Sequence, residues 1–295
     1  MSNSKFLRQI KNPSDFITPI DSTIRFPEVL DILLEKYDDA IDVFCELIRE
    51  LDSSADVLKE IRSPKRTANE RMALLKMFRR CVAPVLDTET TKKIKKVSNE
   101  VLIDTYGHTF KPISKLKGQF GNMQKEMRYA LAALIGEYDT RGQLGYQLTG
   151  AFFDWFEDKF KSILTIEGPR GAGRDIELQD VFSEFEGSYP CDFVIRRAAD
   201  ASVLAVGFAR YDSTRGGAQS DDRTGGNSYK VEKAKSFSVK TGKIFKLVFL
   251  SDGPGLIHRD TWQESCELDG AWNGNVRVST LKLAEQRLTR EWLES

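Results

Sequence analysis

Residues 189–227 read YPCDFVIRRAADASVLAVGFARYDSTRGGAQSDDRTGGN. Two β-rich runs cover residues 191–196 and 202–211, and a turn-prone segment over residues 197–201 separates them. Such runs on either side of a short turn are typical of adjacent antiparallel strands. The sequence therefore predicts a β-hairpin, followed by a polar, glycine-rich loop over residues 213–228.

Acidic residues stand at the ends of both predicted strands. The first strand carries Asp192, and the second runs into Arg210 and Asp212. Burying a carboxylate without a partner is costly, so two acids at neighbouring strand ends suggest a shared cation. Oxygen ligands suit Mg²⁺, which binds one or two carboxylates together with water and substrate phosphates. Asp192 and Asp212 are therefore the predicted metal ligands, and the predicted substrate is a phosphodiester.

The composition is that of a globular protein. The chain has 295 residues, 40% of them hydrophobic and 30% charged, which is enough for two domains that each bury a core. No apolar run approaches the roughly 20 residues of a membrane span, and residues 1–11 lack the apolar core of a signal peptide. We therefore expect a cytoplasmic protein without membrane contact. The four cysteines are scattered without a C-x-x-C pair, which supports neither a zinc site nor a disulfide framework.

The formal net charge of zero hides a basic middle segment. Residues 59–128 hold 17 Lys and Arg against 7 Asp and Glu, whereas residues 1–58 hold 6 against 12 and residues 129–295 hold 21 against 25. A concentrated basic region in a neutral protein fits a phosphate backbone as partner. The simpler alternative is a solvated helical face. The residues predicted to contact DNA from one helix and its entry are Lys65, Arg66, Arg71, Lys76, Arg79 and Arg80, and Lys92, Lys93, Lys95 and Lys96 add to this surface.

The first part of the chain reads as a helical domain. Apolar residues recur at three- and four-residue spacings over residues 22–51, which predicts two amphipathic helices broken near Asp38. Residues 52–54 form a plausible cap for a third helix. The character of the sequence changes near residue 140, so we predict a helical, basic domain over residues 1–140 and a second domain over residues 141–295.

The second domain mixes helices and strands. Residues 244–250 are an apolar run that reads as a buried strand. The order of elements favours an α+β or α/β domain whose mixed sheet is flanked by helices. The glycine-rich segment 168–174 lacks the Lys-Ser/Thr ending of a Walker A loop. Besides the hairpin, the other predicted elements are a helix over residues 148–163, a strand over 163–167, a helix over 229–238 and a final helix over 281–293.

Three short motifs occur in an order that resembles a known nuclease family. Residues 149–154 read TGAFFD, residues 190–192 read PCD, and residues 252–255 read DGPG. In this order, residues 140–260 resemble the PD-(D/E)xK nuclease superfamily, and specifically its type II restriction endonucleases. The resemblance implies that the second domain is a nuclease-like catalytic domain.

The hairpin departs from the family pattern at one point. Its second strand has no (D/E)-x-K triplet, because the expected position falls on residues 207–209, Gly-Phe-Ala. The resemblance implies that Asp192 binds the metal, that Asp212 is the second ligand and that Asp154 is the acid of the first helix. The place of the missing lysine near the scissile phosphate then falls to Arg210, Arg215 or Gln219.

Each of these acids also has a simpler interpretation. Asp212 could cap the loop after its strand. Asp192 could be a strand-end acid paired with Arg196 or Arg210. Asp154 could belong to the polar face of an aromatic-rich helix.

The resemblance also implies an activity and a partner. A type II restriction endonuclease is a site-specific double-stranded DNA endonuclease that hydrolyses phosphodiesters with Mg²⁺ and leaves 5′-phosphate ends. It needs no organic cofactor. Because palindromic sites are usually cut by two-fold symmetric pairs, the resemblance implies a homodimer.

The loop over residues 213–228 has side chains suited to base edges. Arginine pairs with guanine, and glutamine or asparagine with adenine, in the usual bidentate contacts of the major groove. We therefore expect this loop and the basic helices to read and hold duplex DNA. The predicted loop contacts are Arg215, Gln219, Arg223 and Asn227. The alternative is a flexible surface loop without a binding role.

Two other functions remain open from the sequence. The missing lysine favours a non-catalytic, sequence-specific DNA-binding protein whose nuclease domain is degenerate. Alternatively, the basic helices bind an acidic protein partner, in which case DNA binding would be weak and insensitive to salt.

Overall fold

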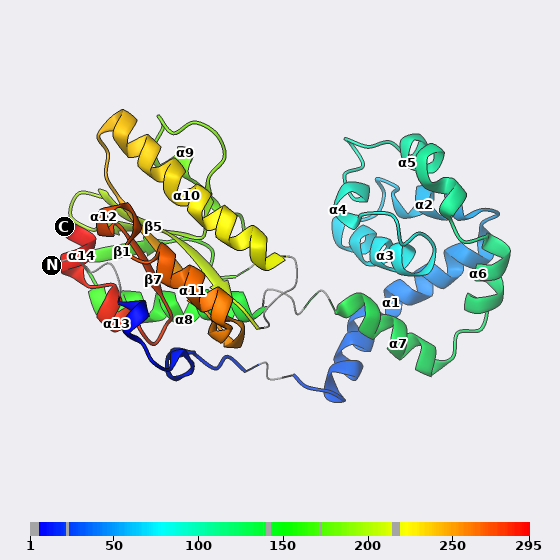
Figure 1. The fold of residues 1–295 in the computed structure, drawn as a ribbon. Helices are drawn as coiled ribbons and strands as arrows, with labels where there is room; N and C mark the ends of the chain where they lie inside the picture. The colour runs from blue at the N-terminus through cyan, green and yellow to red at the C-terminus, as the bar shows by residue number, and fades with distance from the viewer. Residues whose placement is uncertain (1–5, 22–23, 138, 140–142, 172, 214–218) are drawn as a thin grey trace. The chain divides into compact units, whose positions relative to one another are not determined.

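The computed structural model describes two compact units. The described residues are 6–21, 24–137, 139, 143–171, 173–213 and 219–295, with the side chains of residues 219–225 excepted. One unit comprises residues 22–141, hereafter the helical unit, and the other comprises residues 1–21 and 142–295, hereafter the sheet unit (Figure 1). The predicted first domain differs from the observed unit at its start. Residues near the N-terminus belong to the sheet unit because Leu7 is buried in the core beside the sheet.

Helices packed around one apolar core make up the helical unit. Its longest helix, α1, continues through the predicted break at Asp38, so that prediction is wrong. The apolar positions Tyr37, Ile41 and Phe44 keep their helical spacing across the acidic residues, and Arg128 of α7 binds Asp38 at 2.5 Å. The helices of this unit are α1 (Glu28–Glu50), α2 (Ser54–Ile61), α3 (Ala68–Cys81), α4 (Thr88–Thr91), α5 (Asn99–Tyr106), α6 (Ile113–Phe120) and α7 (Lys125–Gly136).

Side-chain caps fix where α2 and α3 begin. Ser53 accepts a hydrogen bond from the N–H of Asp56 at 3.1 Å, which confirms the cap predicted from the sequence. Thr67 and Glu70 form a reciprocal capping box, in which the Glu70 carboxylate accepts from the Thr67 N–H at 2.7 Å. Both caps satisfy backbone donors that the first turn of a helix leaves unpaired.

A polar network in the helical unit centres on Asp139. Its carboxylate accepts hydrogen bonds from the Lys76 ammonium and the Tyr37 hydroxyl, and from Lys36 at 2.9 Å. Burial opposes ionisation, but these bonds together hold the pKa of Asp139 below its ordinary value. Burial and the Asp139 bond raise the pKa of Tyr37. The network therefore stabilises the unit only while Asp139 is ionised.

The Asp139→Asn variant is expected to lose about 2 kcal/mol of stability at neutral pH. Because the folded-state pKa of Asp139 is depressed, its contribution is present above the ordinary aspartate pKa and is lost as pH falls through the folded value. The stability difference between wild type and variant should therefore shrink on acidification. Urea unfolding of both proteins, followed by helical content across the acid range, measures it. A difference that stays constant with pH would contradict the assignment.

The sheet unit contains a five-stranded mixed sheet, in the order β1-β4-β5-β6-β7. Strands β1, β4 and β5 are antiparallel neighbours, and β6 and β7 continue parallel to β5. This confirms the predicted hairpin and the predicted α+β class with a mixed sheet. The strands are β1 (Leu164–Glu167), β4 (Phe193–Arg197), β5 (Val203–Tyr211), β6 (Lys246–Asp252) and β7 (Val276–Ser279), and a separate pair joins β2 (Ile176–Glu177) to β3 (Pro190–Cys191).

Helices cover both faces of this sheet (Figure 1). Along β5, Ala205 faces a core shared with Phe152 of α8, whereas Phe208 faces a core shared with Val231 and Phe237 of α10. This alternation follows from the two-residue period of a strand. The helices of this unit are α8 (Gln143–Phe160), α9 (Leu178–Val181), α10 (Gln219–Thr241), α11 (Arg259–Leu268), α12 (Ala271–Gly274), α13 (Ala284–Arg287) and α14 (Arg290–Glu294).

Two predicted elements differ from the structure. The predicted loop over residues 213–228 is helical from Gln219, because α10 starts there; residues 214–218 lie outside the described residues. The single helix predicted over residues 281–293 is wrong. It is replaced by α13 and α14, since Leu288 leaves the helical conformation and Thr289 caps α14 through the Trp292 N–H at 3.3 Å.

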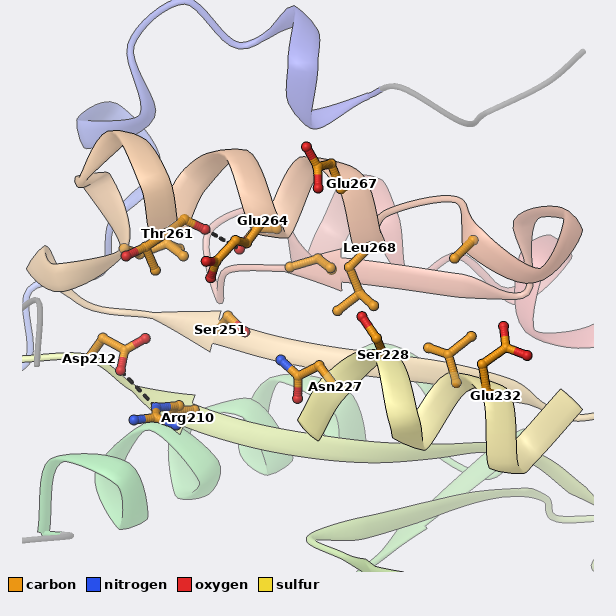
Figure 2. A pocket seen from close by; sticks show the side chains of 15 residues that line it. Arg210, Asp212, Asn227, Ser228, Glu232, Ser251, Thr261, Glu264, Glu267 and Leu268 are labelled. Atoms are coloured by element: carbon orange, nitrogen blue, oxygen red, sulfur yellow. Dashed lines mark hydrogen bonds and ion pairs between the residues drawn. The ribbon is translucent and has the colours of Figure 1, made fainter. Parts of the chain in front are cut away.

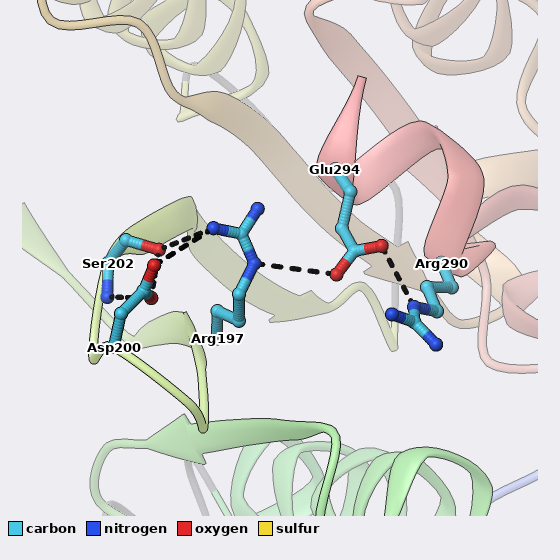
Figure 3. Close-up of polar contacts among 5 residues, drawn as sticks. All are labelled: Arg197, Asp200, Ser202, Arg290 and Glu294. Atoms are coloured by element: carbon cyan, nitrogen blue, oxygen red, sulfur yellow. Dashed lines mark hydrogen bonds and ion pairs between the residues drawn. The ribbon is translucent and has the colours of Figure 1, made fainter.

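The hairpin turn is fixed by side chains and tied to the C-terminus (Figure 3). Asp200 accepts from the Ser202 N–H at 3.0 Å and pairs with Arg197 at 3.1 Å. The hydrogen bonds from Ser202, followed by the interaction with Arg197, lower the pKa of Asp200 to about 2. Arg197 also lies 3.5 Å from Glu294, which Arg290 binds at 2.8 Å. The turn is therefore linked to α14.

Gly207 of β5 lies directly under the ring of Phe193 on β4. A Cβ added to Gly207 would lie 1.9 Å from the Phe193 Cζ atom, which is far inside van der Waals contact. We expect Gly207→Ala to destabilise the sheet unit by about 2 kcal/mol. In a Phe193→Leu background the same change should cost less, and chemical denaturation of the four proteins measures this coupling. Equal losses in both backgrounds would show that the ring is not the cause.

Asp252 joins three separate parts of the sheet unit. It is fully buried at the end of β6. Its carboxylate accepts from the N–H groups of Thr18 at 2.8 Å, Gly253 at 2.8 Å and Leu281 at 2.9 Å. The first residue of the DGPG motif therefore has a structural role, and it holds the N-terminal segment against the sheet.

Candidate active site

Asp192 occupies the bend between β3 and β4. Its N–H donates to the carbonyl oxygen of Gly207 at 2.9 Å, and its carboxylate accepts from the N–H of Ala209 at 2.8 Å. The side chain is half-buried. The hairpin predicted from the sequence therefore holds this carboxylate beside the middle of β5 through two backbone contacts.

Asp175 is the second acid at this position. It immediately precedes β2, whose Ile176 pairs with Cys191 of β3 in antiparallel register. Asp175 and Asp192 thus flank the same end of the β2–β3 pair. Burial, followed by the charge of Asp175, raises the pKa of Asp192, while the Ala209 N–H and Lys230 oppose the rise. Two carboxylates thus lie together where a cation would relieve their repulsion.

Lys230 of α10 completes a cluster with these two acids. Its ammonium lies 3.7 Å from the centre of the Phe208 ring, and its carbonyl oxygen accepts from the Tyr189 hydroxyl at 3.0 Å. Burial lowers the pKa of Lys230, although the charges of Asp192 and Asp175 raise it. We call Asp175, Asp192 and Lys230 the carboxylate–lysine cluster.

Arg210, near the end of β5, and Asp212, just after it, form an ion pair. Arg210 Nε donates to Asp212 Oδ1 at 2.8 Å, and Asp212 is buried beside the start of the DGPG turn. The N–H of Asp212 donates to the carbonyl oxygen of Asp252 at 2.7 Å. Asp212 lies three residues beyond Ala209, about 10 Å along an extended strand. Asp212 contacts Arg210 and Asp252, whereas Asp192 contacts Gly207 and Ala209.

A cavity of about 210 Å³ adjoins this ion pair (Figure 2). It lies between the ends of β5 and β6, the helix α10 and the helix α11. Arg210, Asp212 and Asn227 line one side, and Thr261 and Glu264 of α11 line the other. Of the residues predicted to read DNA from the loop, Asn227 thus lines the same cavity as Arg210.

The remaining predicted loop contacts lie outside the described part of the chain. Arg215 belongs to residues 214–218, whose structure is not described. Gln219 and Arg223 lie in the first turns of α10, but their side chains are outside the described residues. Their predicted roles stay predictions.

Asp154 lies on the other side of the sheet. It belongs to α8, is largely exposed at 74% and forms an ion pair with Arg170. Arg170 also binds Glu157 at 2.5 Å. Since α8 and α10 cover opposite faces of the sheet, the structure does not bring Asp154 to Lys230. Its surroundings fit the polar face of an aromatic-rich helix.

Several predicted DNA contacts in the helical unit have partners within the protein. Arg66 pairs with Glu60 at 3.6 Å, Lys76 binds Asp139, and Arg80 lies 3.4 Å from Glu137. Arg71 donates to the carbonyl oxygen of Arg66. The Nε of Arg79 is buried without a hydrogen-bond partner among the described residues, and Lys65 is exposed. The predicted cationic face of α3 is therefore partly neutralised.

Comparisons with protein-family models, curated proteins and solved structures give no match. None of the helices over the described residues has the length and apolar character to cross a bilayer. Within the same residues, no group of three or more His, Cys, Asp or Glu side chains could hold a metal ion. The carboxylate–lysine cluster therefore offers two protein carboxylates. That number fits Mg²⁺, which keeps several waters and takes further oxygen ligands from a phosphate.

Asp175 and Lys230 are the site residues that the sequence did not reveal. Asp175 reaches Asp192 through a two-residue strand pair, which is too short to show a period-two pattern. Lys230 reaches the cluster because α10 crosses β5, 38 positions along the chain from Asp192. The charged residues just before β2 are the one local signal that sequence reasoning could have used.

Proposed function

We propose that the sheet unit is the catalytic part of a Mg²⁺-dependent nuclease that hydrolyses phosphodiester bonds in double-stranded DNA. The observation that carries this proposal is the carboxylate–lysine cluster. Asp175 and Asp192 flank one end of the β2–β3 pair, and the ammonium of the half-buried Lys230 lies over the ring of Phe208 on β5. The sequence resemblance to type II restriction endonucleases supports the same chemistry. Both point to an endonuclease of the PD-(D/E)xK kind.

Asp175 and Asp192 are the residues that would hold the ion. When bound, Mg²⁺ supplies charge neutralisation at the phosphate and lowers the pKa of a bound water. The Ala209 N–H binds Oδ2 of Asp192 at 2.8 Å and so helps to orient this carboxylate. This ligand pair replaces the pair Asp192 and Asp212 expected from the sequence.

Lys230 takes the place of the missing lysine of the triplet. Its ammonium is fixed over Phe208 within electrostatic range of both acids. A cation at this position stabilises the charge that develops on the phosphate. Burial also lowers its pKa, which makes proton exchange with an attacking water easier.

Asp212 acts through Arg210 in this proposal. The Arg210 guanidinium lies close enough to Lys230 for their charges to interact, and the buried Asp212 holds its Nε. Arg210 is thus a second cation for the scissile phosphate, and Asp212 is its positioning residue.

The finer features of the activity follow from the resemblance. They are cleavage at a specific site, 5′-phosphate ends, a homodimer and base contacts from Arg215, Gln219, Arg223 and Asn227. Asn227 lines the same cavity as Arg210, which supports a base-contacting role for the start of α10. Cytoplasmic location is expected for an enzyme that acts on DNA.

The direct test is incubation of the full chain with long, unmethylated duplex DNA, with Mg²⁺ or with EDTA. Discrete Mg²⁺-dependent fragments support a site-specific endonuclease. DNA that stays intact across many sequences, despite tight binding, supports the second candidate function, a DNA-binding protein without cleavage. The missing (D/E)-x-K triplet is the observation that favours this second candidate.

Lys230→Met is expected to slow cleavage at least 100-fold, because removing one preorganised charge at a reaction centre has effects of that size. The matched control is Lys235→Met on the same helix, where Lys235 is exposed and lies 3.9 Å from Glu232. Cleavage rates at saturating enzyme compare the two. Similar rates for both variants would remove Lys230 from the mechanism.

A further inference from the structure

The turn between α4 and α5 concentrates positive charge. Residues 92–96 read KKIKK, so four of five residues are lysine. All four lysines are exposed, and the central Ile94 is half-buried. Lys92 pairs with Glu89 at 2.5 Å, which leaves the charge of the turn strongly positive.

A buried arginine holds this turn from beneath. Arg62 is 3% exposed, and its Nε donates to the carbonyl oxygen of Thr91 at 2.8 Å. Its other nitrogens donate to the carbonyl oxygen of Val97 and to the side chain of Asn99. One guanidinium therefore binds both ends of the lysine-rich segment. A planar group with several fixed donors is suited to this bracing.

The arrangement costs folding free energy. Burial lowers the pKa of Arg62, which shows that its charge is partly desolvated. The charge of Glu100 offsets part of this cost. The four exposed lysines of the turn concentrate positive charge, to which an anionic partner is complementary.

We propose that the lysine turn, residues 92–96, binds the phosphate backbone of duplex DNA. This inference rests on the proposed function and places the main phosphate contact of the helical unit away from α3. Lysines on flexible stems act as point charges suited to phosphates. Protein partners are usually recognised through buried aromatic or apolar anchors, whereas the exposed side chains of residues 92–96 are all lysines.

The test compares two variants that each remove three positive charges. The first is Lys93→Gln, Lys95→Gln and Lys96→Gln, which leaves the paired Lys92 in place. The matched control is Arg49→Gln, Lys115→Gln and Lys125→Gln, all exposed basic residues of the same unit. Fluorescence anisotropy measures the affinity for a labelled duplex in EDTA over a range of salt concentrations.

We expect the turn variant to lose affinity at least tenfold at low salt. The slope of log affinity against log salt should fall by about 3, because each phosphate contact contributes about 0.9. The control should keep most of the wild-type slope. An unchanged slope in the turn variant, or an equal loss in the control, overturns the proposal.

Catalysis separates this inference from the proposed function. At saturating protein, the turn variant should cleave DNA at the wild-type rate, since residues 92–96 are not in the carboxylate–lysine cluster. If no protein cleaves DNA but the salt slopes are as expected, the nuclease proposal is overturned and the role of the lysine turn is supported. If the proteins cleave DNA and the turn variant binds it with an unchanged salt slope, the nuclease is supported and the role of the lysine turn is overturned.

Discussion

Asp192→Asn is expected to lower the rate of DNA cleavage by about 1,000-fold or more, the size of effect seen when a group essential to a metal-assisted reaction is removed. The amide can still accept the Ala209 N–H bond, so the bend between β3 and β4 should keep its shape. It has no charge with which to hold a divalent ion beside Asp175. Single-turnover cleavage of a duplex with one site measures the loss.

The same variant should be as stable as the wild type or more stable. The folded-state pKa of Asp192 is raised, so the ionised carboxylate disfavours folding above that pKa, and a neutral amide removes this penalty. Loss of activity with retained or increased stability is typical of a functional residue. The matched control is Asp158→Asn, an exposed acid on α8. Normal cleavage by Asp192→Asn would exclude the proposed site.

Asp252→Ala is expected to destabilise the sheet unit by about 4 kcal/mol or more, since charge-assisted hydrogen bonds contribute about 1.5–3 kcal/mol each. The change leaves the buried N–H groups of Thr18, Gly253 and Leu281 without their acceptor. Asp252→Asn should cost about half as much stability. The remaining amide oxygen still accepts hydrogen bonds, whereas the new NH₂ group faces a backbone N–H donor and cannot accept from it. Urea unfolding of the full chain measures both.

A surface control defines the scale of this effect. Asp180→Ala removes an exposed acid at α9 and should change stability by less than about 0.5 kcal/mol. If Asp252→Ala unfolds at the same urea concentration as this control, the three backbone contacts do not hold the segments together.

The hairpin and the strand β6 could be predicted because their apolar runs are long and bounded by turn residues. Gly207 and Phe193 pack within that pattern. The start of α10 could not be predicted in the same way. Its buried positions, Val231 and Phe237, lie in its second half, whereas residues 219–228 are polar and contain two glycines. The sheet core stabilises this helix from its second half, and the local sequence of the first half does not indicate a helix.

The candidate site was only half predictable for a similar reason. Asp192 stands out because an acid inside an apolar strand is unusual. Lys230 and Asp175 are positioned by the packing of α10 on Phe208 and by the β2–β3 pair, neither of which has a sequence period. Asp212 has the right spacing from Arg210 for a shared face, but that spacing produces an ion pair instead of a ligand set. A strand-end acid identified from sequence therefore needs a structure to distinguish ligand from positioning residue.

The attachment of the N-terminal segment makes the helical unit an insertion. Residues 1–21 and 142–295 build one core, with Leu7 buried in it and Thr18 bound to Asp252. A protease that cut the chain between the units should therefore leave a short peptide held without a covalent bond to the larger fragment. An expression clone of residues 142–295 alone would lack this peptide and expose apolar surface. A minimal fragment with the complete core of the sheet unit must thus combine two separate segments of the chain.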